Sequence, residues 1–201
     1  MSRPGRPRAS APPAEVLAAR QRAECLVSAA DVSAAVDRLS VRLSLRLQDT
    51  NPILLTIMNG ALPFAGALLP RLNFPLEVGF LHVGRYRDAT RGGDLVWHSQ
   101  PTVRLHGRTV VLLDDVLDEG KTLAALVEWV RDAGAAEVVT AVLVDKQIAT
   151  ARPLAVDYAA LECPDRYLFG CGMDYQGYWR NLPDIHALPV DLESAGHGAS
   201  D

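Results

Sequence analysis

Short apolar runs divide the chain into strands of the kind that are buried on both faces. Such runs occupy residues 53–58, 109–113 and 137–144. Residues 121–133 instead carry apolar side chains at helical spacing, and this pattern ends at Gly134. Buried strand, helix and buried strand in succession are typical of a parallel sheet covered on both faces. The pattern therefore predicts an α/β fold with a mainly parallel, twisted sheet flanked by helices.

Four further segments complete this pattern. Residues 15–49 predict one or two amphipathic helices, and residues 76–83 alternate as a strand does. Another helix is expected to begin near Pro63. Residues 84–100 are polar, rich in glycine and arginine, and long for a connector. A segment of that length predicts a functional lid or a disordered loop.

The ends of the predicted strands carry polar residues that the apolar runs lack. In open α/β sheets, ligands bind beyond the carboxyl ends of the strands. Chemistry is therefore expected near 58–60, near 114–115 and near 145–146, where asparagine, aspartate and lysine follow the buried runs.

Composition limits the classes of partner and the number of domains. A chain of 201 residues, 49% hydrophobic and 22% charged, fits one globular domain. A net charge of −4 gives no general attraction to nucleic acid or to an anionic membrane, and no apolar run approaches the ~20 residues of a membrane span. The Arg- and Pro-rich residues 1–14 predict a disordered tail rather than a transit peptide, residues 191–201 predict a second tail, and residues 15–190 predict the single domain.

The three cysteines, Cys25, Cys163 and Cys171, show no CxxC or ladder spacing. An odd, sparse set argues against a disulfide scaffold and against a structural zinc site. We expect reduced thiols in a cytoplasmic protein.

The strongest local motif joins the run 110–113 to two adjacent carboxylates, Asp114 and Asp115, and then to the turn 118–122. Neighbouring aspartates at a strand end repel each other, so the site needs a divalent cation or ribose hydroxyls as a partner. The turn leads into a helix N-terminus, where free amides and the helix dipole favour a phosphate. In this turn Gly120 permits close approach and Thr122 adds a hydroxyl donor. The alternative is that Asp118 only caps the helix and that the aspartate pair is solvated.

This motif resembles that of the type I phosphoribosyltransferases, and the order of elements from Ile53 to about Pro189 resembles their hypoxanthine-guanine branch. The resemblance implies that Asp114 and Asp115 bind the ribose hydroxyls of phosphoribosyl pyrophosphate, directly or through Mg²⁺. It implies that Asp118 acts as general base near purine N7. It also implies a small hood subdomain, formed by the N-terminal region and about 153–190.

The same resemblance assigns the phosphate contacts. The backbone of Asp118, Glu119, Gly120 and Lys121, together with Thr122, would hold the 5′-phosphate. Many relatives carry Thr or Ser at the position of Glu119, so its side chain is expected to point away while its amide binds.

A pyrophosphate loop is implied at Asn59 and Gly60, with a non-proline cis peptide before Asn59. Asn59 stands where family members often have lysine. Charge neutralisation would therefore fall more on Mg²⁺, on Arg180 and on backbone amides.

Recognition of the base is expected to centre on a lysine. Lys121 and Lys146 are the only lysines in the chain, and Lys146 follows the buried run 137–144. A lysine that donates to a carbonyl oxygen selects 6-oxopurines over adenine, and the resemblance places such a lysine at 146. The alternative is an ordinary exposed lysine at a strand end.

Residues 164–182 resemble the hood segment of the same branch. By that resemblance Tyr167 stacks on the purine, the backbone of Leu168 meets the 2-position edge, Asp174 is a second Mg²⁺ ligand and Arg180 contacts pyrophosphate. The alternative is a small β segment whose aromatic residues pack on the core.

Arg85 and Tyr86 lie in the long polar segment, which resembles the mobile lid of the family. A closed lid would exclude water and so suppress hydrolysis of the activated sugar. As structure alone, the segment fits a solvated hairpin.

Taken with the resemblance, these residues predict a purine salvage enzyme that transfers the phosphoribosyl group to hypoxanthine or guanine, with Mg²⁺ as cofactor. The alternatives are a regulator of the same fold that senses phosphoribosyl pyrophosphate and binds RNA, and a transferase for xanthine or a pyrimidine. The expected partners are the two small substrates and a second copy of the chain, as a homodimer or homotetramer. Neither nucleic acid nor membrane is expected.

Overall fold

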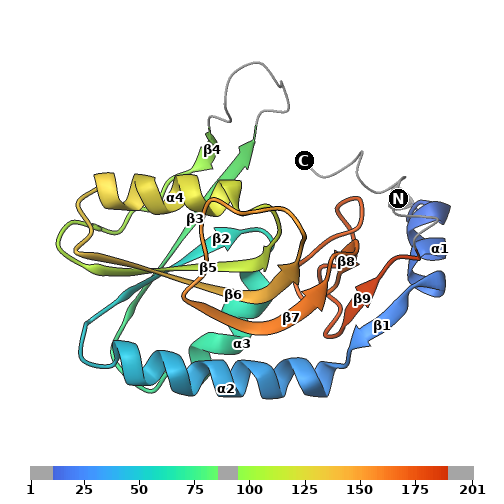
Figure 1. Cartoon of the computed structure of the whole chain (residues 1–201), viewed down its shortest axis with the longest axis horizontal. Helices are drawn as coiled ribbons and strands as arrows, with labels where there is room; N and C mark the ends of the chain where they lie inside the picture. The colour runs from blue at the N-terminus through green and yellow to red at the C-terminus, as the bar shows by residue number, and fades with distance from the viewer. Residues whose placement is uncertain (1–10, 86–94, 190–201) are drawn as a thin grey trace, which may run out of the picture.

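The computed structural model describes residues 11–85 and 95–189, which form a large sheet with helices on both faces and a smaller sheet beside it (Figure 1). The helices are α1 (Ala14–Arg22), α2 (Ala29–Leu47), α3 (Leu62–Leu68) and α4 (Lys121–Asp132), with a 3₁₀ turn at Leu69–Arg71. The strands are β1 (Glu24–Val27), β2 (Ile53–Met58), β3 (Glu77–Arg85), β4 (Leu95–Ser99), β5 (Thr109–Leu117), β6 (Glu137–Gln147), β7 (Tyr158–Pro164), β8 (Leu168–Phe169) and β9 (Ile185–Ala187).

The large sheet has the strand order β4-β3-β2-β5-β6-β7. All its pairs are parallel except β3 with β4, which is antiparallel. Helix α4 covers one face, while α2 and α3 cover the other (Figure 1). This arrangement confirms the predicted α/β fold with a mainly parallel sheet.

Alternate side chains of each central strand enter two different cores. On β5, Val111 and Leu113 join the core beneath α2 and α3, while Val110 and Leu112 join the core beneath α4. All four side chains are fully buried. Burial on both faces explains why the central strands read as continuous apolar runs rather than as alternating ones.

The local sequence of the long helix α2 explains where the helix begins and which of its faces is buried. The Ser28 hydroxyl accepts a hydrogen bond from Asp31 N at 3.2 Å and so caps the first turn. Leu39, Leu43 and Leu47 recur every four residues and are buried against the sheet. This part of the predicted helical region is confirmed.

The smaller sheet has the strand order β1-β9-β8, and we use the name hood for this sheet together with residues 164–182. Helix α1 packs on it through Val16 and Ala19, which contact the cluster around Phe169. The indole Nε1 of Trp179 donates to Val16 O at 2.8 Å, which ties the N-terminal helix to the C-terminal part of the chain.

Three sequence-based boundaries need correction. Residues 15–49 contain the strand β1 between two helices, because residues 24–27 pair with β9 from the far end of the chain. The segment 84–100 is not all loop, since β3 runs to Arg85 and β4 occupies Leu95–Ser99. Helix α1 begins at Ala14, one residue inside the predicted tail, while residues 1–10 and 190–201 lie outside the described residues.

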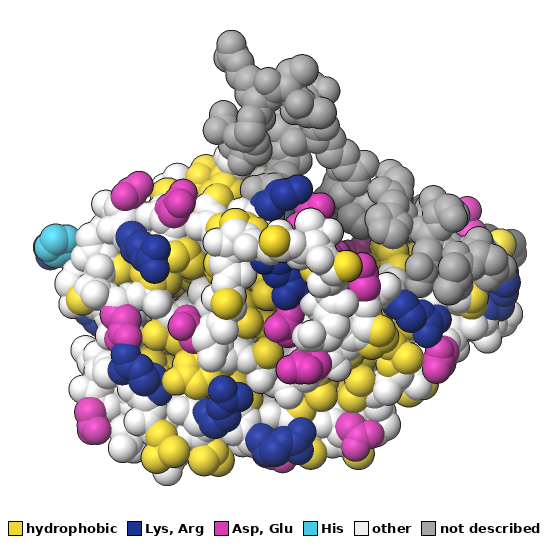
Figure 2. All heavy atoms as spheres, viewed as in Figure 1, with side chains coloured by type: hydrophobic (Ala, Val, Ile, Leu, Met, Phe, Trp, Pro, Cys, Tyr) yellow, Lys and Arg dark blue, Asp and Glu magenta, His cyan; other side chains and the backbone are white. Residues whose placement is uncertain are grey.

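The surface and the helices bear on the class of partner. No helix within 11–85 and 95–189 is both long and apolar enough to cross a membrane. Acidic and basic side chains alternate over the face that Figure 2 shows, without a large area of one sign.

Candidate active site

A cavity of about 520 Å³ opens at the carboxyl ends of β2 and β5. It is lined by the loop after β2, by the aspartates of β5, by the whole turn 118–122 and by two hood residues, Asp174 and Arg180. The predicted ribose, phosphate and pyrophosphate residues are thus brought together at the edge where the sheet topology places a ligand.

The two aspartates of β5 form an electrostatically unfavourable pair. Asp115 is buried, and Asp114 is partly exposed in the cavity wall. Burial raises the pKa of Asp114 well above its usual range, and the charge of Asp115 raises it further. Burial also raises the pKa of Asp115, although hydrogen bonds from its neighbours and the charge of Arg180 oppose the shift. A cation beside these carboxylates would reverse both shifts, so the pair is suited to a divalent metal ion or to hydroxyl donors.

The turn after β5 has the geometry of an anion site. Gly120 takes a left-handed conformation with φ of 73°, and α4 starts at the next residue. The first intrahelical bond runs from Ala124 N to Gly120 O at 2.9 Å. As at any helix N-terminus, the amides before it have no acceptor within the helix. The side chain of Glu119 lies at the surface, with its Oε2 2.7 Å from Lys121 Nζ.

The loop after β2 approaches both the aspartates and the hood through glycine. The Met58–Asn59 peptide is cis, as the resemblance implied. A Cβ on Gly60 would lie 2.2 Å from Asp115 Oδ2, and a Cβ on Gly172 would lie 1.9 Å from Gly60 O. Both contacts are too short for any side chain, so glycine at 60 and 172 lets the loop, the strand end and the hood meet.

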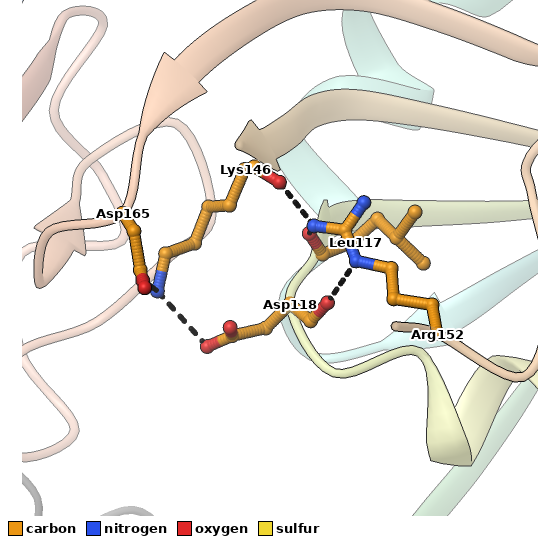
Figure 3. A network of polar contacts seen from close by, with 5 residues as sticks. All are labelled: Leu117, Asp118, Lys146, Arg152 and Asp165. Carbon is orange, nitrogen blue, oxygen red and sulfur yellow. Dashed lines mark hydrogen bonds and ion pairs between the residues drawn. The ribbon is translucent and has the colours of Figure 1, made fainter. Parts of the chain in front are cut away.

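Lys146 is buried and faces the turn after β5. Its Nζ lies 3.1 Å from Asp118 Oδ2 and 3.3 Å from Asp165 Oδ1, as Figure 3 shows. Only 9% of the residue is exposed, so the alternative of an ordinary exposed strand-end lysine is wrong. Two carboxylates therefore hold the ammonium group at the end of β6.

Arg152 is a site residue that sequence reasoning missed. Its Nε donates to Asp118 O at 2.6 Å and its Nη2 to Leu117 O at 3.0 Å. The same guanidinium donates to Lys146 O (Figure 3). It also pairs with Asp145 Oδ1 at 2.5 Å. It therefore fixes the ends of β5 and β6 relative to each other. The available signal was that Arg152 is the only charged residue within 147–156.

Asp165 was also missed, although it lies next to residues that were assigned roles. It contacts Lys146 from the hood side, and it lines a smaller cavity of about 210 Å³ that it shares with Asp118. Only the fold shows that Asp165 and Asp118 meet at one ammonium group, because their segments are far apart in sequence.

Asp174 and Arg180 form a pair at the hood side of the main cavity. Arg180 Nη2 lies 2.6 Å from Asp174 Oδ1, and Arg180 Nη1 donates to Gly172 O at 2.6 Å. The other carboxylate oxygen of Asp174 accepts from Gly177 N at 2.6 Å. The pair is thus held in place by the hood backbone.

Tyr167 and Leu168 lie apart from the main cavity, whose lining includes neither of them nor Lys146. The Tyr167 hydroxyl donates to Asp174 O at 3.1 Å, and its ring meets Tyr175 edge-on with centroids 5.9 Å apart. The Leu168 side chain is buried in the core beneath α2 and α3. The hydrogen bond of Tyr167 joins one predicted base residue to the predicted metal residue Asp174. Tyr86 and the side chain of Arg85, the predicted lid residues, lie outside the described part of the chain.

The donor set fits Mg²⁺. Asp114, Asp115 and Asp174 offer only carboxylate oxygens, the ligand type that this hard cation prefers. Arg180 is the cationic side chain whose charge lowers the pKa of Asp115, and a single arginine balances only part of three carboxylates. The remaining negative charge favours a divalent cation.

Comparison with known proteins identifies the family. Residues 26–176 match the model of the phosphoribosyl transferase domain. The chain belongs to the phosphoribosyl transferase family. The hypoxanthine-guanine phosphoribosyltransferase of Bacillus subtilis (strain 168) is 32% identical over 171 residues, which cover 84% of this chain and 95% of the relative. The protein of the same name from Streptococcus pneumoniae (strain ATCC BAA-255 / R6) is 30% identical and covers 84% and 94% respectively.

Solved structures of this family share the fold. A hypoxanthine phosphoribosyltransferase from Staphylococcus aureus superposes with a TM-score of 0.81 at 23% identity, covering 86% of this chain and 95% of that one. A hypoxanthine-guanine-xanthine phosphoribosyltransferase gives a TM-score of 0.75 at 26% identity, covering 82% and 96%. The family and the fold predicted from the aspartate motif are therefore confirmed.

Proposed function

We propose that this phosphoribosyl transferase converts hypoxanthine or guanine, with phosphoribosyl pyrophosphate, into IMP or GMP and pyrophosphate, as a purine salvage enzyme. The proposal rests most on one observation. The aspartate pair and the phosphate turn share a cavity, and Lys146 reaches the end of that turn at Asp118. The names of the relatives, at about one third identity over most of the chain, point to the same activity.

The proposed sugar site uses the β5 motif and the hood. Asp114 and Asp115 bind the ribose hydroxyls and oppose the positive charge that develops on the sugar in the transition state. The amides of 118–122 and the Thr122 hydroxyl hold the 5′-phosphate. Asn59, Gly60 and Arg180 contact the pyrophosphate.

The proposed metal site uses the three carboxylates Asp114, Asp115 and Asp174. Bound Mg²⁺ supplies positive charge that stabilises the departing pyrophosphate. Asp174 would help to hold the ion, and its partner Arg180 would contact the pyrophosphate oxygens.

The proposed base site lies on the other side of Asp118. Lys146 donates to the 6-oxygen of the purine, and Asp118, as general base, accepts the proton from N7. Adenine carries an amino group at that position and would leave the lysine facing a donor, so the site rejects it. Tyr167 stacks on the ring and the backbone of Leu168 meets the 2-position edge, which requires the base to bind against the hood.

The proposal includes a homodimer or homotetramer in the cytoplasm. The exposed apolar side chains of Val78 and Phe80 on β3, each more than half exposed, support an interface between copies of the chain. The three cysteines form no disulfide, which supports a reducing compartment.

A parallel assay of five bases tests the proposal. The protein is supplied with phosphoribosyl pyrophosphate and Mg²⁺, and turnover of hypoxanthine, guanine, xanthine, adenine and uracil is followed by absorbance. We expect turnover of hypoxanthine or guanine and none of adenine or uracil. Asp118→Asn should lower kcat by about 10²–10⁴-fold, the usual contribution of a general base, while Asp132→Asn, an exposed aspartate at the end of α4, should not.

Two other results would overturn the proposal. Turnover of xanthine alone or of uracil alone would support the phosphoribosyl transfer but show that the proposed base is wrong. Binding of phosphoribosyl pyrophosphate without turnover of any base would contradict the enzyme proposal and favour the regulator of the same fold. An RNA-binding measurement would then test the regulator.

A further inference from the structure

Three potential metal ligands converge in the hood, away from the cavity described above. Cys25 lies on β1, His186 lies on β9 and Asp184 directly precedes β9. One ligand atom of each side chain lies within 4.8 Å of the other two. The strands β1 and β9 run side by side in the small sheet, next to α1 (Figure 1).

The strand register explains this convergence. Cys25 and His186 are direct partners across the antiparallel β1–β9 pair, so their side chains lie on the same face of the sheet. Asp184 stands two residues before His186, the spacing that returns an extended chain to the same face. The cluster is therefore a product of the fold and not a chance contact of long surface side chains.

The strongest indication of a bound ligand is the buried side chain of His186. It is only 2% exposed, and its ring stacks on Phe169 with centroids 5.4 Å apart. Its Nε2 lies 2.8 Å from Asp184 Oδ1, yet neither atom has a partner with hydrogen-bond geometry, and Nδ1 has no partner among the described residues. Buried polar nitrogens without partners are costly, by about 1–3 kcal/mol each. A metal ion would satisfy one of them.

We propose that Cys25 Sγ, a ring nitrogen of His186 and the carboxylate of Asp184 bind Zn²⁺. Thiolate, imidazole and carboxylate are ligands that zinc accepts, and the thiolate disfavours Mg²⁺. The thiol loses its proton to solvent as the sulfur coordinates the metal. The thiolate and the carboxylate then balance the two positive charges, and water takes the fourth position.

Only a small rearrangement closes the site. Ligand atoms around a tetrahedral zinc ion are separated by roughly 3.5 Å, given bonds of about 2.0–2.3 Å. The three ligand atoms are at most 4.8 Å apart in the structure. Rotation of one side chain is enough to shorten such a separation to the value required by zinc. Cys25 is exposed and forms no disulfide, and its thiol makes only a long hydrogen bond of 3.7 Å to Val27 O, so its side chain can make this movement.

Zinc at this position would link β1 to β9, and β9 pairs with the segment that carries Tyr167 and Leu168. Phe169, the next residue along, pairs directly with His186 across β8 and β9. Metal binding would therefore stabilise the hood sheet as a unit, because binding free energy adds to folding free energy. This inference does not depend on the proposed transferase activity.

Cobalt and zinc binding to the whole 201-residue chain test the proposal. After removal of metals with a chelator, Co²⁺ should produce a thiolate-to-cobalt charge-transfer band that saturates at one ion per chain. Zn²⁺ should abolish the band and raise the melting temperature. Cys25→Ser and His186→Asn should lose the band and bind Zn²⁺ at least about tenfold more weakly.

Two control variants separate this site from other metal-binding groups. Cys163→Ala changes a buried thiol on β7, and Asp174→Asn changes the carboxylate in the main cavity, so both should keep the band. Absence of the band in the unsubstituted protein, or its persistence in Cys25→Ser, would overturn the proposal. Because Cys25 is exposed, its serine variant should fold even where His186→Asn does not.

Discussion

Arg152 joins the chain segments that carry Asp118 and Lys146, and Arg152→Ala is expected to loosen both. In the structure one guanidinium donates to the carbonyls of Leu117, Asp118 and Lys146 and pairs with the carboxylate of Asp145. Alanine would leave three carbonyls and one carboxylate without this donor. The ends of β5 and β6 would then lose their common support.

The magnitude follows from the burial of the pair. The side chains of Arg152 and Asp145 are 15% and 23% exposed, so water replaces the lost contacts poorly. Removing one partner of such a pair costs about 3–5 kcal/mol. For a chain of this length each kcal/mol lowers the melting temperature by about 2–4 °C, so a fall of roughly 6–20 °C is expected. If Asp118 moves by about 1 Å as a result, kcat/KM should fall by about 100-fold.

Thermal melts and steady-state kinetics of four proteins measure both effects. They are the unsubstituted protein, Arg152→Ala, Asp118→Asn and the double variant. If Arg152 acts by positioning Asp118, its substitution should lower kcat/KM strongly in the first background and only slightly in the Asp118→Asn background. Arg131→Ala, an exposed arginine in the last turn of α4, is the matched control and should change neither quantity. Additive losses in the double variant, or a normal melting temperature for Arg152→Ala, would refute the positioning role.

Two further predictions concern the aspartate pair. Gly60→Ala should lower kcat/KM by about 100-fold, because its Cβ would displace the buried Asp115 carboxylate, which lies 2.2 Å away. Gly66→Ala in α3, where a Cβ would meet nothing within 4 Å, should instead stabilise the fold by about 0.5–1 kcal/mol, and equal effects of the two would contradict this account. Asp114→Asn should raise the melting temperature of the metal-free protein at neutral pH while it abolishes activity. The folded-state pKa of Asp114 lies above the usual 3.8, so ionisation opposes folding as the pH rises, and the gain should vanish below about pH 3.8; a gain independent of pH would contradict the stated cause.

Elements with a strong internal pattern could be predicted, and elements made by distant pairing could not. The apolar runs of β2, β5 and β6 and the helical pattern of α4 lie within a few residues of their predicted bounds. The strands β1 and β9 are only four and three residues long and are stabilised by each other. Nothing local to Glu24–Val27 distinguishes a strand from a helix end, because its partner lies at the far end of the chain.

The same distinction applies to the site. The residues from Asp114 to Thr122 form a continuous motif whose chemistry is readable from spacing, and the structure places all of them at the main cavity. Arg152 and Asp165 belong to no motif and act through contacts across the fold. Cysteine spacing argued against a zinc site and gave no sign of the cluster of Cys25, Asp184 and His186. Spacing detects only ligands that are of one type and close together in the sequence.

Phosphorus NMR of a single reaction mixture tests the central claim most directly. Phosphoribosyl pyrophosphate, Mg²⁺ and hypoxanthine are incubated with the protein, and the phosphorus signals are followed over time. The account predicts that pyrophosphate and a nucleoside 5′-monophosphate appear in equal amounts, and only when the base is present. Pyrophosphate formed together with free ribose 5-phosphate, or an unchanged spectrum, would contradict it.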